Sequence, residues 1–128
     1  MNQFGPYTPI VKAGATYYVS GQVGVDPITK TCSGDITSQT RQALANLKDV
    51  LKTEGLDMGN VVKTTVFLTD MGNFAAMNKE YVKHFDEPRP ARSTVAVKEL
   101  PRLANTPLLV EIEAVACGIL TGANEHGV

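Results

Sequence analysis

Apolar positions follow two different patterns along this chain, one typical of strands and one typical of helices. Short runs rich in β-branched residues, or apolar at every second position, predict five strands, at 9–14, 16–21, 61–68, 90–97 and 108–117. Helical spacing over 36–51 predicts a first helix, which Asp35 can cap and Gly55 ends. A second helix is predicted to begin at its cap, Asn73, and to stop before Pro88. The apolar side of this second helix holds Phe74, Met77, Tyr81 and Phe85.

The order of these elements predicts an α+β fold with a mixed, mostly antiparallel sheet and both helices packed on one face. Alternate residues of the last strand, from Leu108 to Ala116, are apolar and predict its buried side. Its opposite side is only half apolar, which on a chain of 128 residues indicates burial against another subunit. Residues 1–120 are expected to form a single domain and 121–128 a polar C-terminal tail.

The composition disfavours several functional classes. A formal net charge of −1 and the lack of a basic aromatic patch speak against nucleic acid as a partner. No apolar run approaches a membrane span and no signal peptide is visible, so we expect a cytoplasmic protein without membrane contact. The two cysteines and two histidines lie far apart, which predicts neither a disulfide nor a metal site; they are Cys32, Cys117, His84 and His126.

Ionisable side chains on the last two predicted strands indicate a site. Arg92 begins one strand, and Glu111 and Glu113 share one face of the other. We expect these two strands to be adjacent, and an arginine and two carboxylates on adjacent short strands are costly to bury unless they are paired or used on a ligand. A guanidinium can clamp a carboxylate, and a glutamate can act on a water as a general base. From spacing alone, a structural role is the favoured alternative: Arg92 forms an ion pair with Glu111, with Glu113 or with a neighbouring subunit. The glutamates in turn pair with arginine, lysine or backbone N–H groups across the sheet.

Four other residues are candidates for lining a cleft. Asn78 lies beside the apolar stripe of the second helix, where a backbone-satisfied amide is the favoured interpretation. Tyr7 belongs to an N-terminal segment that must dock to be ordered, either into a pocket or simply by packing. Ser20 and Gly21 end a strand, where they can line a cleft or serve only the turn.

Seven segments, in one order, resemble the RidA family, also known as the YjgF family. The resemblance runs from Gly5 to about Ala116, and seven ordered segments are far more specific than any single one. The segments are Gly5-Pro6-Tyr7, Ser20-Gly21-Gln22, Gln42-Ala43-Leu44-Ala45-Asn46-Leu47, Val62-Lys63-Thr64-Thr65-Val66-Phe67-Leu68, Phe74-Ala75-Ala76-Met77-Asn78, Pro90-Ala91-Arg92-Ser93 and Val110-Glu111-Ile112-Glu113-Ala114.

The resemblance implies a chorismate-mutase-like α+β fold, a homotrimer with clefts at its subunit interfaces, and no metal or cofactor. It implies hydrolysis of reactive 2-imino or enamino acids to 2-oxo acids and ammonia. The family's carboxylate-binding arginine matches Arg92, and its water-positioning glutamate matches Glu111. The other matched substrate-binding positions are Tyr7, Ser20, Gly21, Asn78 and Thr94.

The sequence departs from the family pattern in three places. Thr94 stands where many members have cysteine, so no thiol nucleophile is expected there. The 85–92 connection is shorter and the 100–110 connection longer than in some members, and both would border the cleft. These departures leave two alternatives: a deaminase of another enamine, such as an aminoacrylate or aminomuconate, or a non-catalytic regulatory trimer that binds small carboxylates. Ribonuclease activity, also described for the family, is disfavoured by the charge.

Overall fold

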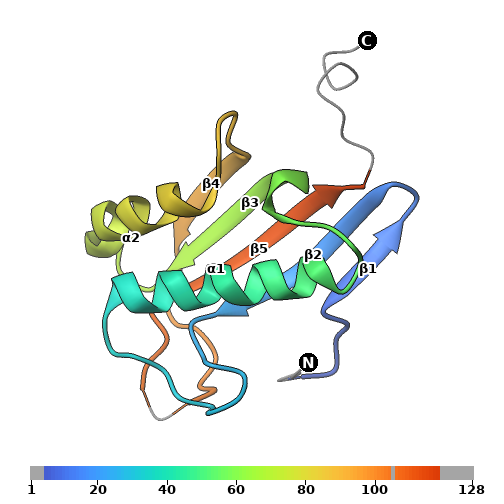
Figure 1. Ribbon diagram of the computed structural model, residues 1–128. Helices are drawn as coiled ribbons and strands as arrows, with labels where there is room; N and C mark the ends of the chain where they lie inside the picture. The colour runs from blue at the N-terminus through green and yellow to red at the C-terminus, as the bar shows by residue number, and fades with distance from the viewer. Residues whose placement is uncertain (1–4, 105, 119–128) are drawn as a thin grey trace.

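The computed structural model describes residues 5–104 and 106–118, in which two α-helices cover one face of a five-stranded sheet (Figure 1). The strands lie in the order β1-β2-β5-β3-β4; β3 and β4 run parallel, and the other neighbours run antiparallel. This arrangement confirms the mixed, mostly antiparallel sheet with both helices on one face. The elements are β1 (Ile10–Ala13), β2 (Thr16–Val23), α1 (Ile36–Lys52), β3 (Val61–Leu68), α2 (Phe74–Tyr81), β4 (Ala91–Ala96) and β5 (Val110–Cys117).

Short 3₁₀ turns, at Met58–Asn60, Met71–Asn73 and Val82–His84, flank β3 and α2. The predicted tail, 121–128, lies outside the described residues, as does His126. Within the described part of the chain, no helix is long and apolar enough to cross a membrane.

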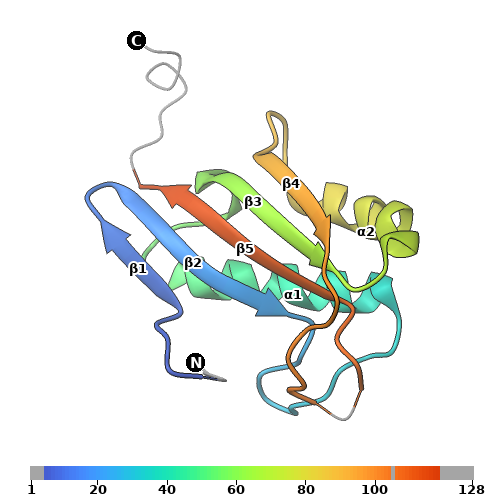
Figure 2. The same cartoon turned by 180° about the vertical axis from the view of Figure 1, so that it is seen from behind.

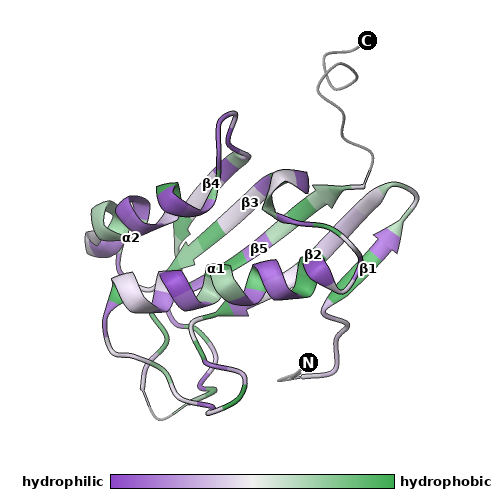
Figure 3. Ribbon diagram, in the orientation of Figure 1, coloured by the Kyte–Doolittle hydropathy of each residue, from purple (hydrophilic) through white to green (hydrophobic). Residues whose placement is uncertain are grey.

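The first helix begins where its sequence predicts. The carboxylate of Asp35 accepts a hydrogen bond from the Ser38 amide, satisfying one of the amides that a helix start leaves unpaired. Polar and apolar residues alternate along α1 (Figure 3), and its apolar side is buried against the sheet. The helix ends at Lys52, and Gly55 adopts a φ of 73° in the turn that follows, a conformation that favours glycine.

The second helix begins differently from the prediction. Asn73 makes no side-chain cap, because the chain enters α2 through the 3₁₀ turn Met71–Asn73. Asp70 caps that turn instead, by accepting a hydrogen bond from the Gly72 amide. On the predicted apolar side Met77, Tyr81 and Phe85 are buried, whereas Phe74, in the first turn, remains 39% exposed.

The two faces of the sheet differ sharply. Apolar β5 residues at alternate positions, from Val110 to Ala116, are buried beneath the helices, as predicted. The opposite face carries no helix (Figure 2). Val11, Tyr18 and Val95 lie on this open face and are 49%, 52% and 42% exposed. The face of the sheet that carries no helix is therefore partly apolar and exposed in a single copy of the chain.

One buried glutamine fastens the 97–109 loop to the rest of the molecule. The Gln39 amide nitrogen donates to the carbonyls of Ser33 and Pro107, at 2.8 and 3.0 Å, and its oxygen accepts from the Leu109 amide at 2.7 Å. Gly24 makes this possible: a Cβ there would lie 2.7 Å from Gln39 Cα, too close for any other residue. The loop is consequently held beside the start of β5.

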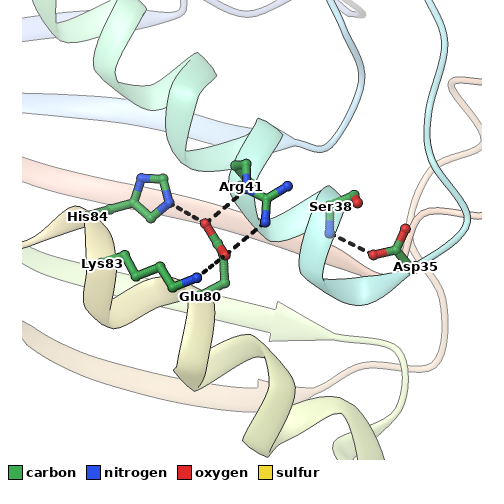
Figure 4. Close-up of polar contacts among 6 residues, drawn as sticks. All are labelled: Asp35, Ser38, Arg41, Glu80, Lys83 and His84. Atoms are coloured by element: carbon green, nitrogen blue, oxygen red, sulfur yellow. Dashed lines mark hydrogen bonds and ion pairs between the residues drawn. The ribbon is translucent and has the colours of Figure 1, made fainter.

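A buried carboxylate joins the two helices. Glu80 of α2, whose side chain is 3% exposed, receives hydrogen bonds from Arg41 of α1 at 3.2 Å and lies 2.8 Å from His84 (Figure 4). Lys83 adds a third positive partner at 3.5 Å. Burial raises the pKa of Glu80, but the hydrogen bonds of His84 and Arg41 and the charges of Arg41 and Lys83 outweigh it, so the pKa lies below its ordinary value.

We predict that Glu80→Gln lowers the free energy of unfolding at pH 7 by about 2 kcal/mol, since the amide keeps the shape but loses the charge. Because the folded-state pKa is lowered, the stabilisation is fully present above the unfolded-state pKa and is lost as pH falls through the folded-state value. The difference between the parent and the variant should therefore shrink below about pH 4. Urea unfolding at a fixed protein concentration and a series of pH values measures this difference. The exposed Glu54→Gln is the control, and equal stability of Glu80→Gln and the parent at pH 7 would contradict the prediction.

Candidate functional site

Arg92 and Glu111 lie on opposite faces of the sheet. The expectation of adjacent strands is wrong, because β3 lies between β4 and β5. Arg92 pairs in register with Thr64, a buried residue of the helix-covered face, whereas Glu111 pairs with Phe67, which points the other way. An ion pair between Arg92 and either glutamate of the same chain, the alternative favoured by spacing, is therefore wrong as well.

Arg92 lies in a pocket of about 270 Å³ beside α2, which we call the Arg92 pocket. Its guanidinium carbon is 4.8 Å from the ring centre of Tyr81 and 5.7 Å from that of Phe74. None of the described carboxylates forms an ion pair with Arg92. Cation–π contacts occupy the face of the guanidinium and leave its N–H edges for a planar anion. The pocket is lined by Asn78, Tyr81, Val82, Arg89, Pro90 and Arg92.

The Tyr81 ring, which contacts the Arg92 guanidinium, is held in place through its hydroxyl group. Its hydroxyl lies 2.7 Å from Thr64 Oγ1, within hydrogen-bond distance in a buried environment. Burial raises the pKa of Tyr81, so the phenol stays neutral across the physiological range. Arg89, the other cation of the pocket, is ion-paired with Glu87. Arg92 is thus the cation that this pocket offers to a ligand.

Two acceptor atoms near Arg92 are buried and have no hydrogen-bond partner among the described residues: Asn78 Oδ1 and Thr94 Oγ1. The interpretation of Asn78 as a satisfied amide is therefore wrong for its oxygen. Thr94 follows Arg92 by two residues on β4 and shares its face. Buried polar atoms without partners are costly and rare, so both are available to a ligand or to a second chain.

Glu111 lies in a second pocket of about 360 Å³, which we call the Glu111 pocket. Three other candidate residues, Tyr7, Ser20 and Gly21, line it as well. The seven candidates therefore divide into two groups, with Asn78, Arg92 and Thr94 on the other face. The lining residues are Tyr7, Pro9, Ser20, Gly21, Gln22, Val23, Asn46, Pro101, Leu103, Glu111 and Glu113.

The Glu111 carboxylate lies directly against the backbone of Gly21. A Cβ at Gly21 would lie 2.1 Å from Glu111 Oε2, so a side chain there would displace the carboxylate. No hydrogen bond or ion pair from the described residues holds Glu111. Burial raises its pKa, and the negative charge of Glu113 on the same strand face raises it further. A carboxyl group whose pKa is raised accepts a proton more readily than an ordinary glutamate, which suits it to take a proton from a water.

The comparisons with known proteins agree on one family. A family model described as Endoribonuclease L-PSP matches residues 1–117. This chain belongs to the RidA family. It is 44% identical to the mouse 2-iminobutanoate/2-iminopropanoate deaminase over 113 residues, which cover 88% of this chain and 81% of the mouse protein. It is also 44% identical to RutC family protein PH0854 of Pyrococcus horikoshii over 113 residues, covering 88% of this chain and 86% of that protein.

Solved RidA structures share the fold. The chain superposes on RidA of the Antarctic bacterium Psychrobacter sp. PAMC 21119 with a TM-score of 0.85 and 37% identity, covering 91% of each chain. It superposes on E. coli TdcF with bound serine with a TM-score of 0.83 and 38% identity, covering 90% of each chain. The α+β architecture expected from the resemblance is confirmed.

In this RidA-family chain the N-terminal segment forms a strap beside the middle of β2. The expectation that Ser20 and Gly21 end a strand is wrong, because β2 passes through a bulge there and continues to Val23. Ser20 Oγ donates to the Thr8 carbonyl at 2.7 Å, and the Ser20 amide donates to the Pro9 carbonyl at 2.9 Å. A shift in register between Val19 and Gln22 marks a bulge in β2 at this point. Ser20 therefore holds the strap, and the strap places Tyr7, 43% exposed, at the pocket.

Several residues at the two RidA-family pockets were not predicted as site residues. The sequence predicts Tyr81 and Phe74 only as part of the apolar side of a helix, because nothing in their spacing distinguishes a core ring from one that contacts a cation. Pro101 and Leu103 belong to the lengthened 100–110 connection, and that insertion was the signal that could have indicated them. Among the described residues, no group of three or more histidines, cysteines or acidic residues could hold a metal ion.

We predict that Glu113→Gln lowers the pKa of Glu111 toward its ordinary value, because it removes the like charge that disfavours the ionised form. Burial remains in the variant, so the value should stay above that of an exposed glutamate. The titration of the Glu111 carboxyl carbon, followed by NMR, measures the shift. Glu54→Gln, remote from the pocket, should leave the titration unchanged. An identical Glu111 titration in Glu113→Gln and the parent would refute the predicted coupling.

Proposed function

We propose that this protein is a hydrolytic deaminase that converts reactive 2-imino and enamino acids to 2-oxo acids and ammonia. The observation that carries the proposal is the division of the candidate residues into an unpaired arginine in one pocket and a carboxyl group of raised pKa in another. An imino acid needs both functions: a cation for its carboxylate and an acceptor that orients a water. The printed activity of the mouse relative supports the same reaction class.

The complete site requires a second copy of the chain. Arg92 and Glu111 point away from each other across one sheet, so one small substrate cannot contact both within a protomer. A neighbouring copy that covers the open face can bring its Arg92 pocket to this Glu111 pocket. Association would remove exposed apolar side chains on that face from water, among them Val11, Tyr18 and Val95. A head-to-tail contact of this kind closes into a ring, and we propose the homotrimer implied by the family resemblance.

The proposed reaction adds water across the carbon–nitrogen double bond. Arg92 holds the substrate carboxylate through two parallel hydrogen bonds. Glu111 accepts a proton from the water as its oxygen bonds to the imine carbon, and that proton is passed on to the nitrogen. The resulting carbinolamine loses ammonia when the carbon–nitrogen bond breaks, while its hydroxyl proton departs to leave the oxo group. Because a protonated imine is already electrophilic, positioning supplies most of the acceleration.

The other candidates have supporting parts in this proposal. Tyr7 places its phenol at the mouth of the Glu111 pocket, and Gly21 leaves room for the carboxylate. Asn78 Oδ1 and Thr94 Oγ1 are acceptors for N–H or O–H groups of the substrate or of the second chain. Thr94 supplies no thiol, so the proposed chemistry uses no covalent intermediate with the protein.

We predict that Arg92→Ala and Glu111→Gln each lower the deaminase rate at least about a hundredfold. Because the two residues act from different copies, mixed oligomers of the two variants should regain activity. Random mixing in equal amounts leaves about a quarter of the sites with both residues intact. The assay couples a serine/threonine dehydratase to the protein and follows release of the 2-oxo acid and trapping of the imine.

The matched control mixes each variant with a protein that carries both substitutions, which forms no intact site. If the Arg92→Ala and Glu111→Gln mixture stays inactive although mixed oligomers form, the two-copy site is refuted. If the parent binds a small 2-oxo acid but never accelerates imine hydrolysis, the protein is instead the non-catalytic binding trimer.

A further inference from the structure

The Arg92 guanidinium lies against two aromatic rings and has no partner of opposite charge. Its central carbon is 4.8 Å from the ring centre of Tyr81 and 5.7 Å from that of Phe74, and none of the described carboxylates forms an ion pair with it. An arginine side chain in water samples many rotamers, and a ligand that binds it must restrict them at a cost in free energy. A ring that restricts Arg92 in the free protein removes part of that cost.

The nearer of the two rings, Tyr81, is fixed by buried contacts. Its hydroxyl lies 2.7 Å from Thr64 Oγ1, and the two residues are only 4% and 0% exposed. Its ring also packs against Phe85, with the ring centres 4.8 Å apart. Thr64 of β3 pairs in register with Arg92 of β4. The strand neighbour of Arg92 is therefore the residue that holds the ring covering Arg92, and we call these two hydroxyls the Thr64–Tyr81 pair.

The Thr64–Tyr81 pair is one of several attachments of α2 to the rest of the molecule. Met77 of the same helix is fully buried, Phe85 just beyond it is 5% exposed, and Glu80 is bonded to Arg41 of α1. Two apolar side chains of the same shape could replace the hydroxyls without leaving a polar group unpaired. What the pair adds is direction, because a hydrogen bond fixes the orientation of the Tyr81 ring more strictly than apolar packing does.

We propose that the Thr64–Tyr81 pair positions Arg92 for binding a carboxylate: Thr64 fixes the Tyr81 ring, and the ring holds the face of the guanidinium so that its N–H edges point into the Arg92 pocket. The inference rests on the proposed function, in which Arg92 binds the substrate, and adds two positioning residues to it. Both act through Arg92, because their hydroxyls are buried and bonded to each other. A planar guanidinium held over a ring keeps the fork that a carboxylate requires.

Three variants remove the hydroxyls and keep the shape of the core. Tyr81→Phe and Thr64→Val each delete one hydroxyl and leave the other buried without its partner, so each should lower the free energy of unfolding. The double variant deletes both and leaves neither unpaired, so its stability should lie closer to that of the parent. Thr40→Val is the matched control: it makes the same exchange at another fully buried threonine, whose Oγ1 has no hydrogen-bond partner among the described residues.

The first measurement needs no ligand. In a nitrogen–proton NMR spectrum of the assembled protein, the Arg92 Nε–H signal is assigned by its loss in Arg92→Ala. The ring current of Tyr81 should shift this signal away from that of an exposed arginine such as Arg102. We expect the signal to move toward the exposed value in the double variant, and by a smaller amount in Tyr81→Phe, while Thr40→Val leaves it in place.

The second measurement is the affinity for 2-oxobutanoate, a small 2-oxo acid, followed by calorimetry. The double variant should raise the Kd about fivefold, since Arg92 must then be ordered by the ligand. In the coupled deaminase assay KM should rise by a similar factor, whereas kcat stays within about twofold of the parent. The reason is that Arg92 and Glu111 are both intact and in place once the substrate is bound. Thr40→Val should keep the parent's Kd, KM and kcat.

The outcomes separate this inference from the proposed function. If the parent hydrolyses no imine, the deaminase proposal fails, and the Arg92 Nε–H signal and the Kd still decide whether the pair positions Arg92. If either the signal or the Kd is the same in the double variant and the parent, the Thr64–Tyr81 pair only joins α2 to β3 and the inference is overturned. A fall in kcat at unchanged KM would overturn it as well, because positioning of Arg92 acts on substrate binding.

Discussion

The alternation of side chains along β5, β3 and β4 determines which face of the sheet Arg92 and Glu111 occupy. Ile112, Val66 and Thr94 stand in register on the helix-covered face, so their neighbours Glu111 and Phe67 must point to the open face. Arg92 lies two residues before Thr94 on the same strand, so its side chain lies on the helix-covered face as well. A shift of one residue in the β3–β5 pairing would turn Glu111 to the helix-covered face and expose the buried residues of β5. The same shift in the β3–β4 pairing would turn Arg92 to the open face. The core that stabilises the fold therefore also keeps the two charged groups apart.

This separation explains how a small domain carries a strong cation and a perturbed carboxyl group without pairing them. The guanidinium of Arg92 is held over aromatic rings, and the Glu111 carboxyl group is confined against Gly21, each in its own pocket. Neither group is satisfied within the protomer, and two nearby acceptors, Asn78 Oδ1 and Thr94 Oγ1, are equally unpartnered. Of these groups, Glu111 lies on the open, half-apolar face of the sheet. Unsatisfied groups and an uncovered face are both features that a second copy of the chain can resolve.

Much of this arrangement could be predicted from the sequence, because it depends on periodicity. The two-residue pattern of β5 gave its buried side and the shared face of Glu111 and Glu113, and Asp35 marked the start of α1. The neighbours of each strand could not be predicted in the same way, since pairing depends on contacts between distant segments. The sequence order of 90–97 and 108–117 suggested adjacent strands, whereas β3 inserts between them by pairing parallel with β4. That difference in strand order separates Arg92 from Glu111, and the register of the strands places them in two different pockets. The placement of the 97–109 loop was also beyond prediction, because Gln39 holds it through hydrogen bonds to Pro107 and Leu109, which are distant in the sequence.

In the proposed site, Arg92 of one copy and Glu111 of another act on the same small molecule. A crystal structure of the assembled protein soaked with a small 2-oxo acid, the product of the proposed reaction, would show whether they do. We expect the ligand to lie between two copies, with its carboxylate on Arg92 of one and its oxo carbon beside Glu111 of the other. A 2-oxo acid bound to Arg92 with no Glu111 of any copy near its oxo carbon would contradict it.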